Sequence, residues 1–429
     1  MLRIAVAPPS CGALRQTTLA TGEVHGTRPD AGGRPVQRSR VGTRRPSRDV
    51  VATAGGAVLF ALALGVATVA LPLLAIAAGY NGIEIGILAA LSALSQMSTR
   101  LVLGPVMRVF PEWILVLAAG LLLAASNAVV AASSALVAFG LAQLLQGVAR
   151  ACFWTGSQTH VVRGDGPAVR GLAVVNLASS VGLVAGPVLA GMLTERSPQL
   201  ALGAGAGVAL VACIPALFLH RLPPFALPDE RPAGRLWRRP GVDGGCWAGV
   251  TAGAWRGLLG SYVPVALSAA QLTSSTIGVL VSVANTASLA GSGVVARVRG
   301  AWVGWSYAVA TVATGVATAA VAMFAGSPWA AGAALAVSGL GAGVLQTVGP
   351  AMAAEAVHPQ ERGEVIAVTG TFRAGALFAA PLAVAAMLPV VPLTLAMATA
   401  GAVIALPVLT ARRVHRTVTF DRPAHQSCG

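Results

Sequence analysis

The distribution of positive charge constrains the fold of this chain more than any other feature. All 29 basic residues are arginine, and in the interior of the chain they cluster in every second gap between successive apolar runs. The remaining gaps contain a single arginine, Arg196. Arginine-rich loops of helical membrane proteins stay on the cytoplasmic side of the bilayer. The pattern therefore predicts a protein that crosses a membrane many times.

Twelve apolar runs separate these gaps, and each is close to the roughly 20 residues that a helix needs to span a bilayer. They cover residues 51–78, 83–103, 113–130, 135–156, 172–193, 201–219, 246–267, 277–295, 302–324, 329–354, 365–388 and 393–409. With arginine-rich segments before the first run and after the last, both termini are expected in the cytoplasm. We therefore predict an all-α membrane protein with twelve transmembrane helices.

Polar segments divide the chain. Residues 1–50 are rich in Arg, Gly, Pro, Ser and Thr, which predicts a disordered basic cytoplasmic tail, and residues 412–429 predict a second tail. The longest internal polar stretch, 221–245, is expected to be a cytoplasmic linker. It separates a predicted N-terminal six-helix half, 51–220, from a C-terminal half, 246–411.

The two halves also share sequence features. Residues 104–113 read GPVMRVFPEW and residues 293–302 read GVVARVRGAW, with Gly, Val, Arg, Val and Trp at matching positions. At nearly the same offset, Gly147 corresponds to Gly339. These matches indicate an internal duplication. Two six-span halves related by a parallel repeat are one plan of membrane transporters, whose binding site lies near mid-membrane between the halves.

In this arrangement of two six-span halves, the chain resembles the major facilitator superfamily over about residues 50 to 411. The family signature after span 2 is a glycine, an Asp-Arg pair and a second glycine before basic residues. Gly104 matches the first glycine, but Arg108 and Pro111 stand where the aspartate and the second glycine would fall. In span 5, Gly186-Pro187 looks like a Gly-Pro signature of proton-coupled exporters. The resemblance implies alternating access, with Gly186 and Pro187 as candidate gating positions.

Three arginines interrupt apolar spans well away from their ends: Arg150, Arg256 and Arg373. Each costs at least ~2.5–3.5 kcal/mol at a helix centre unless it meets water, a carbonyl or a partner, so all three should face the bundle interior. Arg256 is the deepest, roughly 15 Å from the cytoplasmic end of its span at the helical rise. Alternatively, Arg150 and Arg373 reach the interface or brace a neighbouring helix.

The spans contain no deeply placed aspartate or glutamate, so a cavity lined by these arginines should prefer anionic groups. On span 4, polar residues recur every three or four positions and so share one helical face with Arg150: Gln143, Gln146 and Trp154. Further candidates for solute contact are Asn176, Asn285 and Gln346.

Candidates for gating or coupling lie at span ends: Glu355, His160, Glu84 and Arg108. Glu355 paired with an inner-side arginine would close the inner mouth, and the candidate partners are Arg108, Arg163 and Arg297. The alternative is that these side chains are simply solvated at the interface.

These features predict a secondary transporter of small solutes, with proton-coupled export as one form of it. The alternatives are a facilitator or exchanger of an anionic metabolite, a solute receptor that does not transport, and a membrane-embedded enzyme. An ATP-driven pump is excluded, because the phosphate-binding loop needs a lysine and the chain has none. The histidines show no metal-binding spacing, so we expect no metal, no cofactor and no enzymatic activity.

The net charge of +15 does not indicate nucleic-acid binding, because the arginines flank the spans, where anionic lipid headgroups are the natural partners. We expect a monomer in a plasma membrane, namely a bacterial inner membrane. Its partners would be membrane lipid and a small-molecule substrate.

Overall fold

The computed structural model describes residues 48–163, 168–223, 236–239, 241–295, 302–357 and 362–411. Within these ranges the chain is helical and contains no strand, as the apolar runs predict. The first group of helices comprises α1 (Arg48–Ala77), α2 (Gly82–Met107), α3 (Glu112–Ala132), α4 (Leu136–Arg163), α5 (Ala168–Thr194), α6 (Pro198–Val211) and α7 (Cys213–Leu217).

A short 3-10 helix, Leu236–Arg238, precedes the second group. This group comprises α8 (Val242–Leu259), α9 (Tyr262–Ala269), α10 (Ser274–Val295), α11 (Trp302–Met323), α12 (Pro328–Glu355), α13 (Arg362–Met387) and α14 (Leu393–Ala405). A final 3-10 turn, Leu406–Thr410, follows α14 directly.

Eleven helical segments of the described residues are long and apolar enough to cross a membrane. The twelfth predicted span, 246–267, is divided between α8 and α9, and neither part qualifies by itself. Gly260 ends α8, with its N–H bonded to the Arg256 carbonyl oxygen at 3.2 Å. Pro264, in the first turn of α9, has no N–H to continue the helical ladder. The chain is therefore a multi-pass helical membrane protein whose seventh span is broken.

Both groups of helices pack in the same way. In the first group α1 packs on α5, and both α2 and α3 pack on α4; in the second, α8 packs on α13, and both α10 and α11 pack on α12. A Cβ on Gly147 would lie 2.3 Å from the Ser92 carbonyl oxygen of α2. A Cβ on Gly339 would lie 2.2 Å from the Ala284 carbonyl oxygen of α10. The sequence repeat thus corresponds to an equivalent close approach of two helices in each group.

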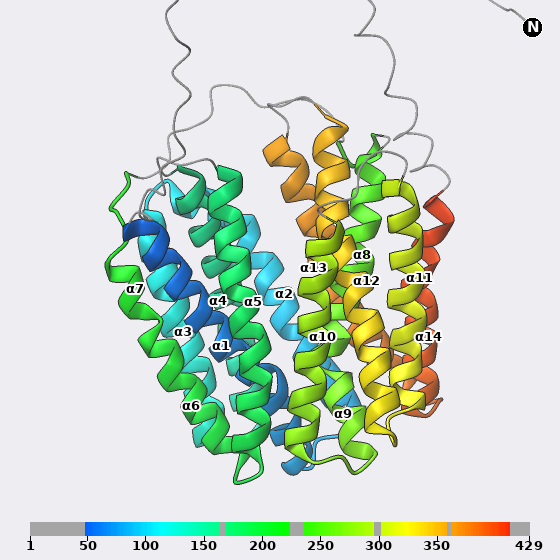
Figure 1. Cartoon of the computed structure of the whole chain (residues 1–429). Coiled ribbons are helices and arrows are strands. Elements are labelled where there is room, and N and C mark those ends of the chain that lie inside the picture. Colours follow the sequence, from blue (N-terminus) through cyan, green and yellow to red (C-terminus); the bar gives the residue numbers. More distant parts are fainter. Residues whose placement is uncertain are drawn as a thin grey trace, which may run out of the picture. The chain divides into compact units, whose positions relative to one another are not determined.

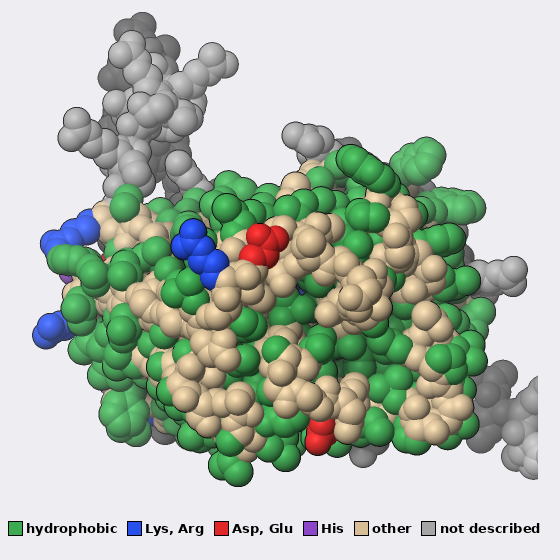
Figure 2. Space-filling view, turned by 90° about the horizontal axis from the view of Figure 1, so that it is seen from below, with side chains coloured by type: hydrophobic (Ala, Val, Ile, Leu, Met, Phe, Trp, Pro, Cys, Tyr) green, Lys and Arg blue, Asp and Glu red, His purple; other side chains and the backbone are tan. Residues whose placement is uncertain are grey.

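The two groups meet crosswise: α5 contacts α10, and α2 contacts α13 (Figure 1). Large apolar side chains remain exposed on the outside, including Trp302, Trp305 and Val309 of α11. Figure 2 shows the face away from the described ends of the chain, where hydrophobic and uncharged groups dominate and charged side chains are few. This is the face that the arginine pattern predicts to point out of the cytoplasm.

Candidate functional site

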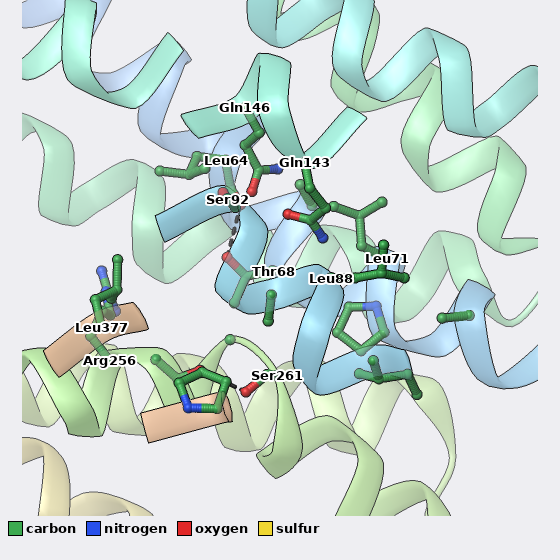
Figure 3. A pocket seen from close by; sticks show the side chains of 18 of the residues that line it. Leu64, Thr68, Leu71, Leu88, Ser92, Gln143, Gln146, Arg256, Ser261 and Leu377 are labelled. Carbon is green, nitrogen blue, oxygen red and sulfur yellow. Dashed lines mark hydrogen bonds between the residues drawn. The ribbon is translucent and has the colours of Figure 1, made fainter. Parts of the chain in front are cut away.

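A cavity of about 90 Å³ lies where the two groups of helices meet, beside the α8–α9 break (Figure 3). This volume has room for a few water molecules. The charged residues of its lining are Arg150 from α4 and Arg256 from α8. The neutral polar residues of its lining are Thr68, Ser92, Gln143, Gln146 and Ser261.

The polar stripe on α4 supplies one side of this cavity. Gln143, Gln146 and Arg150 all line it, as their spacing predicts. Trp154, the fourth member of the stripe, instead packs on the apolar core of the first group and makes an edge contact with Phe153, with ring centroids 5.4 Å apart. The predicted polar face therefore lines the cavity over two helical turns, from Gln143 to Arg150, and Trp154 one turn later does not.

Arg256 lies in the last turn of α8, where the helix dipole favours a cation. Its Nη1 donates a hydrogen bond to Oδ1 of Asn285 on α10. Asn285 Nδ2 in turn donates to the Leu183 carbonyl oxygen of α5 at 3.0 Å. Asn285, predicted to contact solute, is thus a positioning partner of Arg256 and links it to the other group of helices.

Arg373 does not line the cavity. Its Nη2 donates to Oε1 of Gln346 at 3.0 Å, and Gln346 Nε2 donates to the Ser288 hydroxyl at 3.3 Å. Both predicted site residues thus link α13, α12 and α10 and are absent from the cavity lining. Asn176 is exposed on α5 and is likewise absent from the cavity lining.

Three groups that line the cavity are buried without a hydrogen-bond partner in the structure: Arg150 Nε, Gln146 Nε2 and Ser92 Oγ. Ser92 and Gln146 are only 2% and 3% exposed. An unpaired buried polar group costs about 1–3 kcal/mol. Each of the three donates hydrogen bonds, so the cavity presents donors to whatever occupies it.

The two groups of helices touch closely on the side predicted to face outward. The Tyr262 hydroxyl donates to the Gly82 carbonyl oxygen at 2.7 Å, and the Ser282 hydroxyl donates to the Val184 carbonyl oxygen at 2.6 Å. A Cβ on Gly278 of α10 would lie 2.2 Å from the carbonyl oxygen of Pro187.

The two predicted gating positions of span 5 therefore have different surroundings. Pro187 faces α10 of the other group through its carbonyl oxygen, whereas Gly186 packs on Gly65 of α1 within its own group.

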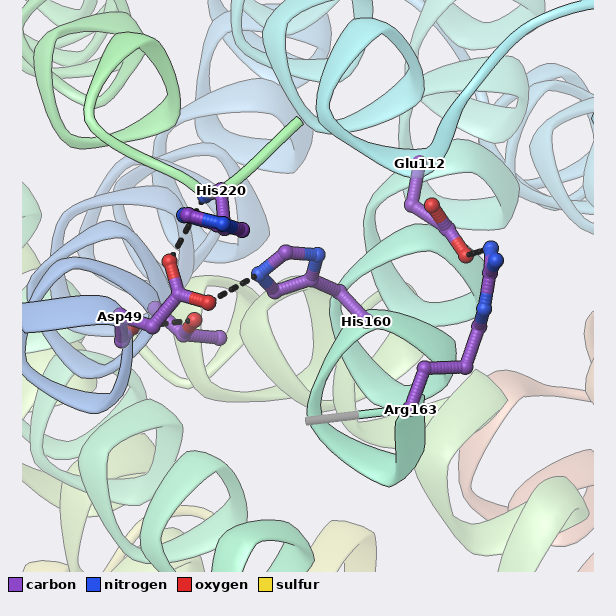
Figure 4. A network of polar contacts seen from close by, with 6 residues as sticks. Asp49, Glu112, His160, Arg163 and His220 are labelled. Atoms are coloured by element: carbon purple, nitrogen blue, oxygen red, sulfur yellow. Dashed lines mark hydrogen bonds and ion pairs between the residues drawn. The ribbon is translucent and has the colours of Figure 1, made fainter. Parts of the chain in front are cut away.

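His160 and Arg163, at the end of α4 that is predicted to be cytoplasmic, contact acidic side chains inside the first group (Figure 4). His160 Nε2 lies 3.1 Å from Asp49 Oδ2, and Asp49 Oδ1 accepts the His220 backbone N–H at 2.8 Å. Arg163 pairs with Glu112 and donates to the Pro223 carbonyl oxygen at 2.8 Å. Sequence reasoning missed Asp49 and Glu112, which stand at the starts of spans where acids are ordinary.

The other predicted mouth residues are placed as follows. Glu84 completes a helix cap, because its Oε2 accepts the Asn81 backbone N–H at 2.8 Å while Asn81 Oδ1 accepts the N–H of Glu84 at 3.0 Å. Glu355 and Arg108 are both exposed, and Glu355 forms no ion pair with Arg108 or Arg163. The third candidate partner, Arg297, lies outside the described residues.

Among the described residues, no group of three or more His, Cys, Asp or Glu side chains is arranged to hold a metal ion. The polar groups of the cavity suit a solute that accepts hydrogen bonds.

A family model described as the Major Facilitator Superfamily matches residues 53–381. No curated protein matches the chain by sequence. Among solved structures, a mutant of the nucleoside transporter NupG superposes with a TM-score of 0.69 at 10% identity, covering 86% of this chain and 99% of that chain.

A POT family transporter in complex with 5-aminolevulinic acid gives a TM-score of 0.69 at 10% identity, covering 87% of this chain and 97% of that chain. A bacterial homologue of the human lysosomal transporter Spinster, inward-facing and unoccupied, gives a TM-score of 0.62 at 12% identity, covering 87% and 96%. At these identities the similarity concerns the fold.

Proposed function

Because this chain belongs to the Major Facilitator Superfamily, we propose that it moves a small solute across the membrane by alternating access through the cavity between α4 and α8. The observation that carries the proposal is the composition of the cavity wall. Residues of α1, α2, α4 and α5 line one side, and residues of α8, α13 and the α8–α9 break line the other. A site shared in this way is exposed to alternate sides when the two groups rock against each other.

The charged part of the lining consists of two arginines, which favours an anionic solute. Facilitated diffusion or exchange of such a solute is the mode that we propose. Proton-coupled export is the second candidate, and the Gly186-Pro187 sequence favours it. Two of the predicted coupling residues already have structural contacts, because His160 contacts Asp49 and Glu84 caps α2. We place the protein, as a monomer, in a bacterial plasma membrane.

Filling the cavity tests the proposal. Thr68 lines the cavity, and its hydroxyl donates to the carbonyl oxygen four residues earlier at 2.9 Å. Thr399 makes the same intrahelical bond at 2.8 Å on the exposed side of α14, so it is a matched control. The full chain is reconstituted in liposomes and uptake of labelled anions, cations and neutral solutes is measured. We expect saturable uptake that is lost in Thr68→Trp and retained in Thr399→Trp. Uptake that persists unchanged in Thr68→Trp would remove the cavity from the pathway.

A further inference from the structure

We propose that the solute is a small dianion held between Arg150 of α4 and Arg256 of α8, an inference that rests on the proposed function of the cavity. Such a dianion carries two negative charges on oxygen atoms, as a dicarboxylate or a phosphate group does.

The first step of the argument is charge. Arg256 has a neutral hydrogen-bond partner in Asn285, and Arg150 Nε has none. Among the described residues that line the cavity, none is acidic. Two cationic side chains thus face one space inside the membrane, where an uncompensated charge is costly. A neutral solute leaves both charges unbalanced and a monoanion leaves one, whereas a dianion balances both.

The second step is hydrogen bonding. Besides Arg150 Nε, the unpaired Gln146 Nε2 and Ser92 Oγ line the same cavity, and both side chains are more than nine-tenths buried. Gln146 and Ser92 lie on the side of the cavity opposite Arg256 (Figure 3). Donors converging from several directions suit a solute with several acceptor oxygens. The fork of N–H groups on a guanidinium matches the geometry of carboxylate and phosphate oxygens.

The third step is size. The cavity has room for only a few water molecules, so the solute should be small. Inorganic phosphate and short dicarboxylates are small solutes of this kind, whereas bulky amphiphiles are not. Because each arginine belongs to a different group of helices, a dianion also screens the repulsion between them when the groups close around it.

The test uses the detergent-purified full chain and thermal unfolding. Affinities come from the dependence of Tm on the concentration of succinate, inorganic phosphate, acetate, uridine or tetraphenylphosphonium. We expect a dianion to bind at least tenfold more tightly than acetate, and Arg150→Gln or Arg256→Gln to weaken dianion binding at least tenfold. The matched control is Arg196→Gln, which changes an exposed arginine outside the cavity. Comparing the affinities for succinate and phosphate shows whether the site prefers a dicarboxylate or a phosphate group.

A second readout separates solute binding from bracing. Without solute, Arg150→Gln should raise Tm, because it removes a buried charge that lacks a partner at Nε. A fall in this Tm, together with no stabilisation by either dianion, would show that Arg150 braces the bundle and would overturn the proposal. Stabilisation by uridine or tetraphenylphosphonium that survives in the Arg150→Gln/Arg256→Gln double variant would also overturn it.

Liposome assays separate this inference from the proposed function. Uptake of a neutral or cationic solute that is retained in the double variant would contradict the dianion but leave the transporter intact. Arginine-dependent binding of a dianion that never crosses the liposome membrane would contradict transport and leave the dianion site intact.

Discussion

At the scale of single residues, the pair of Glu112 and Arg163 ties the start of α3 to the end of α4. Glu112 is 1% exposed and Arg163 is 23% exposed. Removing one member of a fully buried pair typically costs ~3–5 kcal/mol, because the other charge is left unpaired. The partial exposure of Arg163 reduces this penalty through solvent screening.

We therefore expect Arg163→Gln to lower the stability of the detergent-solubilised protein by about 2 kcal/mol, somewhat less than for a fully buried pair. The Glu112→Gln/Arg163→Gln double variant should regain most of this loss, because two neutral amides can share a hydrogen bond. Thermal unfolding measures both, with the exposed Arg108→Gln as control. Additive losses in the double variant would argue against the pair.

Asn285 allows a second experiment at this scale. Asn285→Asp places a carboxylate against Arg256 and neutralises one of the two cavity charges. We expect affinity for a dianion to fall at least tenfold, measured by thermal shift. Asn176→Asp adds the same charge on α5 outside the cavity lining and should leave the affinity unchanged. Equal losses in the two variants would indicate a general effect of added negative charge.

Residue spacing predicted part of this site. The three-and-four spacing placed Gln143, Gln146 and Arg150 on one helical face, and the predicted depth of Arg256 made it a candidate; all four line the cavity. The same spacing included Trp154, which packs on the apolar core instead of lining the cavity, because a periodic pattern does not show where a cavity ends. It also missed Ser92, since one serine in a span rich in small residues gives no signal. Contacts between helices, such as that of Arg256 with Asn285, depend on how the helices pack, so the sequence of a single span does not predict them.

At the scale of elements, the packing of α5 on α10 depends on close approach at Gly278. A Cβ there would lie 2.2 Å from the Pro187 carbonyl oxygen, a backbone atom that cannot move without its helix. Gly293 lies on the same helix, and its Cβ would meet no atom within 4 Å. The two positions form a matched pair for testing whether this interface closes the outer side.

Gly278→Ala should therefore separate α5 from α10 and favour the outward-open arrangement. We expect a cysteine introduced at Ser261, which lines the cavity, to react several-fold faster with a membrane-impermeant thiol reagent added from outside. Gly293→Ala in the same background should leave the rate unchanged. Equal rates in both glycine variants would rule out this interface as the outer closure.

Hydropathy predicted the twelve spans but not the interruption of the seventh. Residues 246–267 read as one apolar run, whereas the structure divides them at Gly260 and Ser261. Gly260 and Pro264 are residues that can break a helix, and both are visible in the sequence. Such residues are frequent in membrane spans, however, and often leave the helix intact. The first helix also includes Arg48 and Asp49, which precede the apolar run, and Asp49 contacts His160 and the His220 backbone N–H.

At the scale of the whole molecule, the arginine distribution predicts which face is cytoplasmic. In a background lacking the five native cysteines, Arg196→Cys should react with an impermeant thiol reagent in intact cells, and Arg108→Cys should react only after the cells are opened. The reverse pattern would invert the orientation, and every assignment of an inner or outer mouth would change with it.

The divided seventh span also affects how the chain enters the membrane. Insertion machinery tests each segment for hydrophobicity as it emerges, and a central arginine costs ~2.5–3.5 kcal/mol at this step. Neither α8 nor α9 is among the eleven helical segments of the described residues that are long and apolar enough to cross a membrane. We therefore expect the insertion of this span to be assisted by neighbouring helices, such as α13, on which α8 packs. The arginine that we propose to bind an anion would then also make this span dependent on other helices during biogenesis.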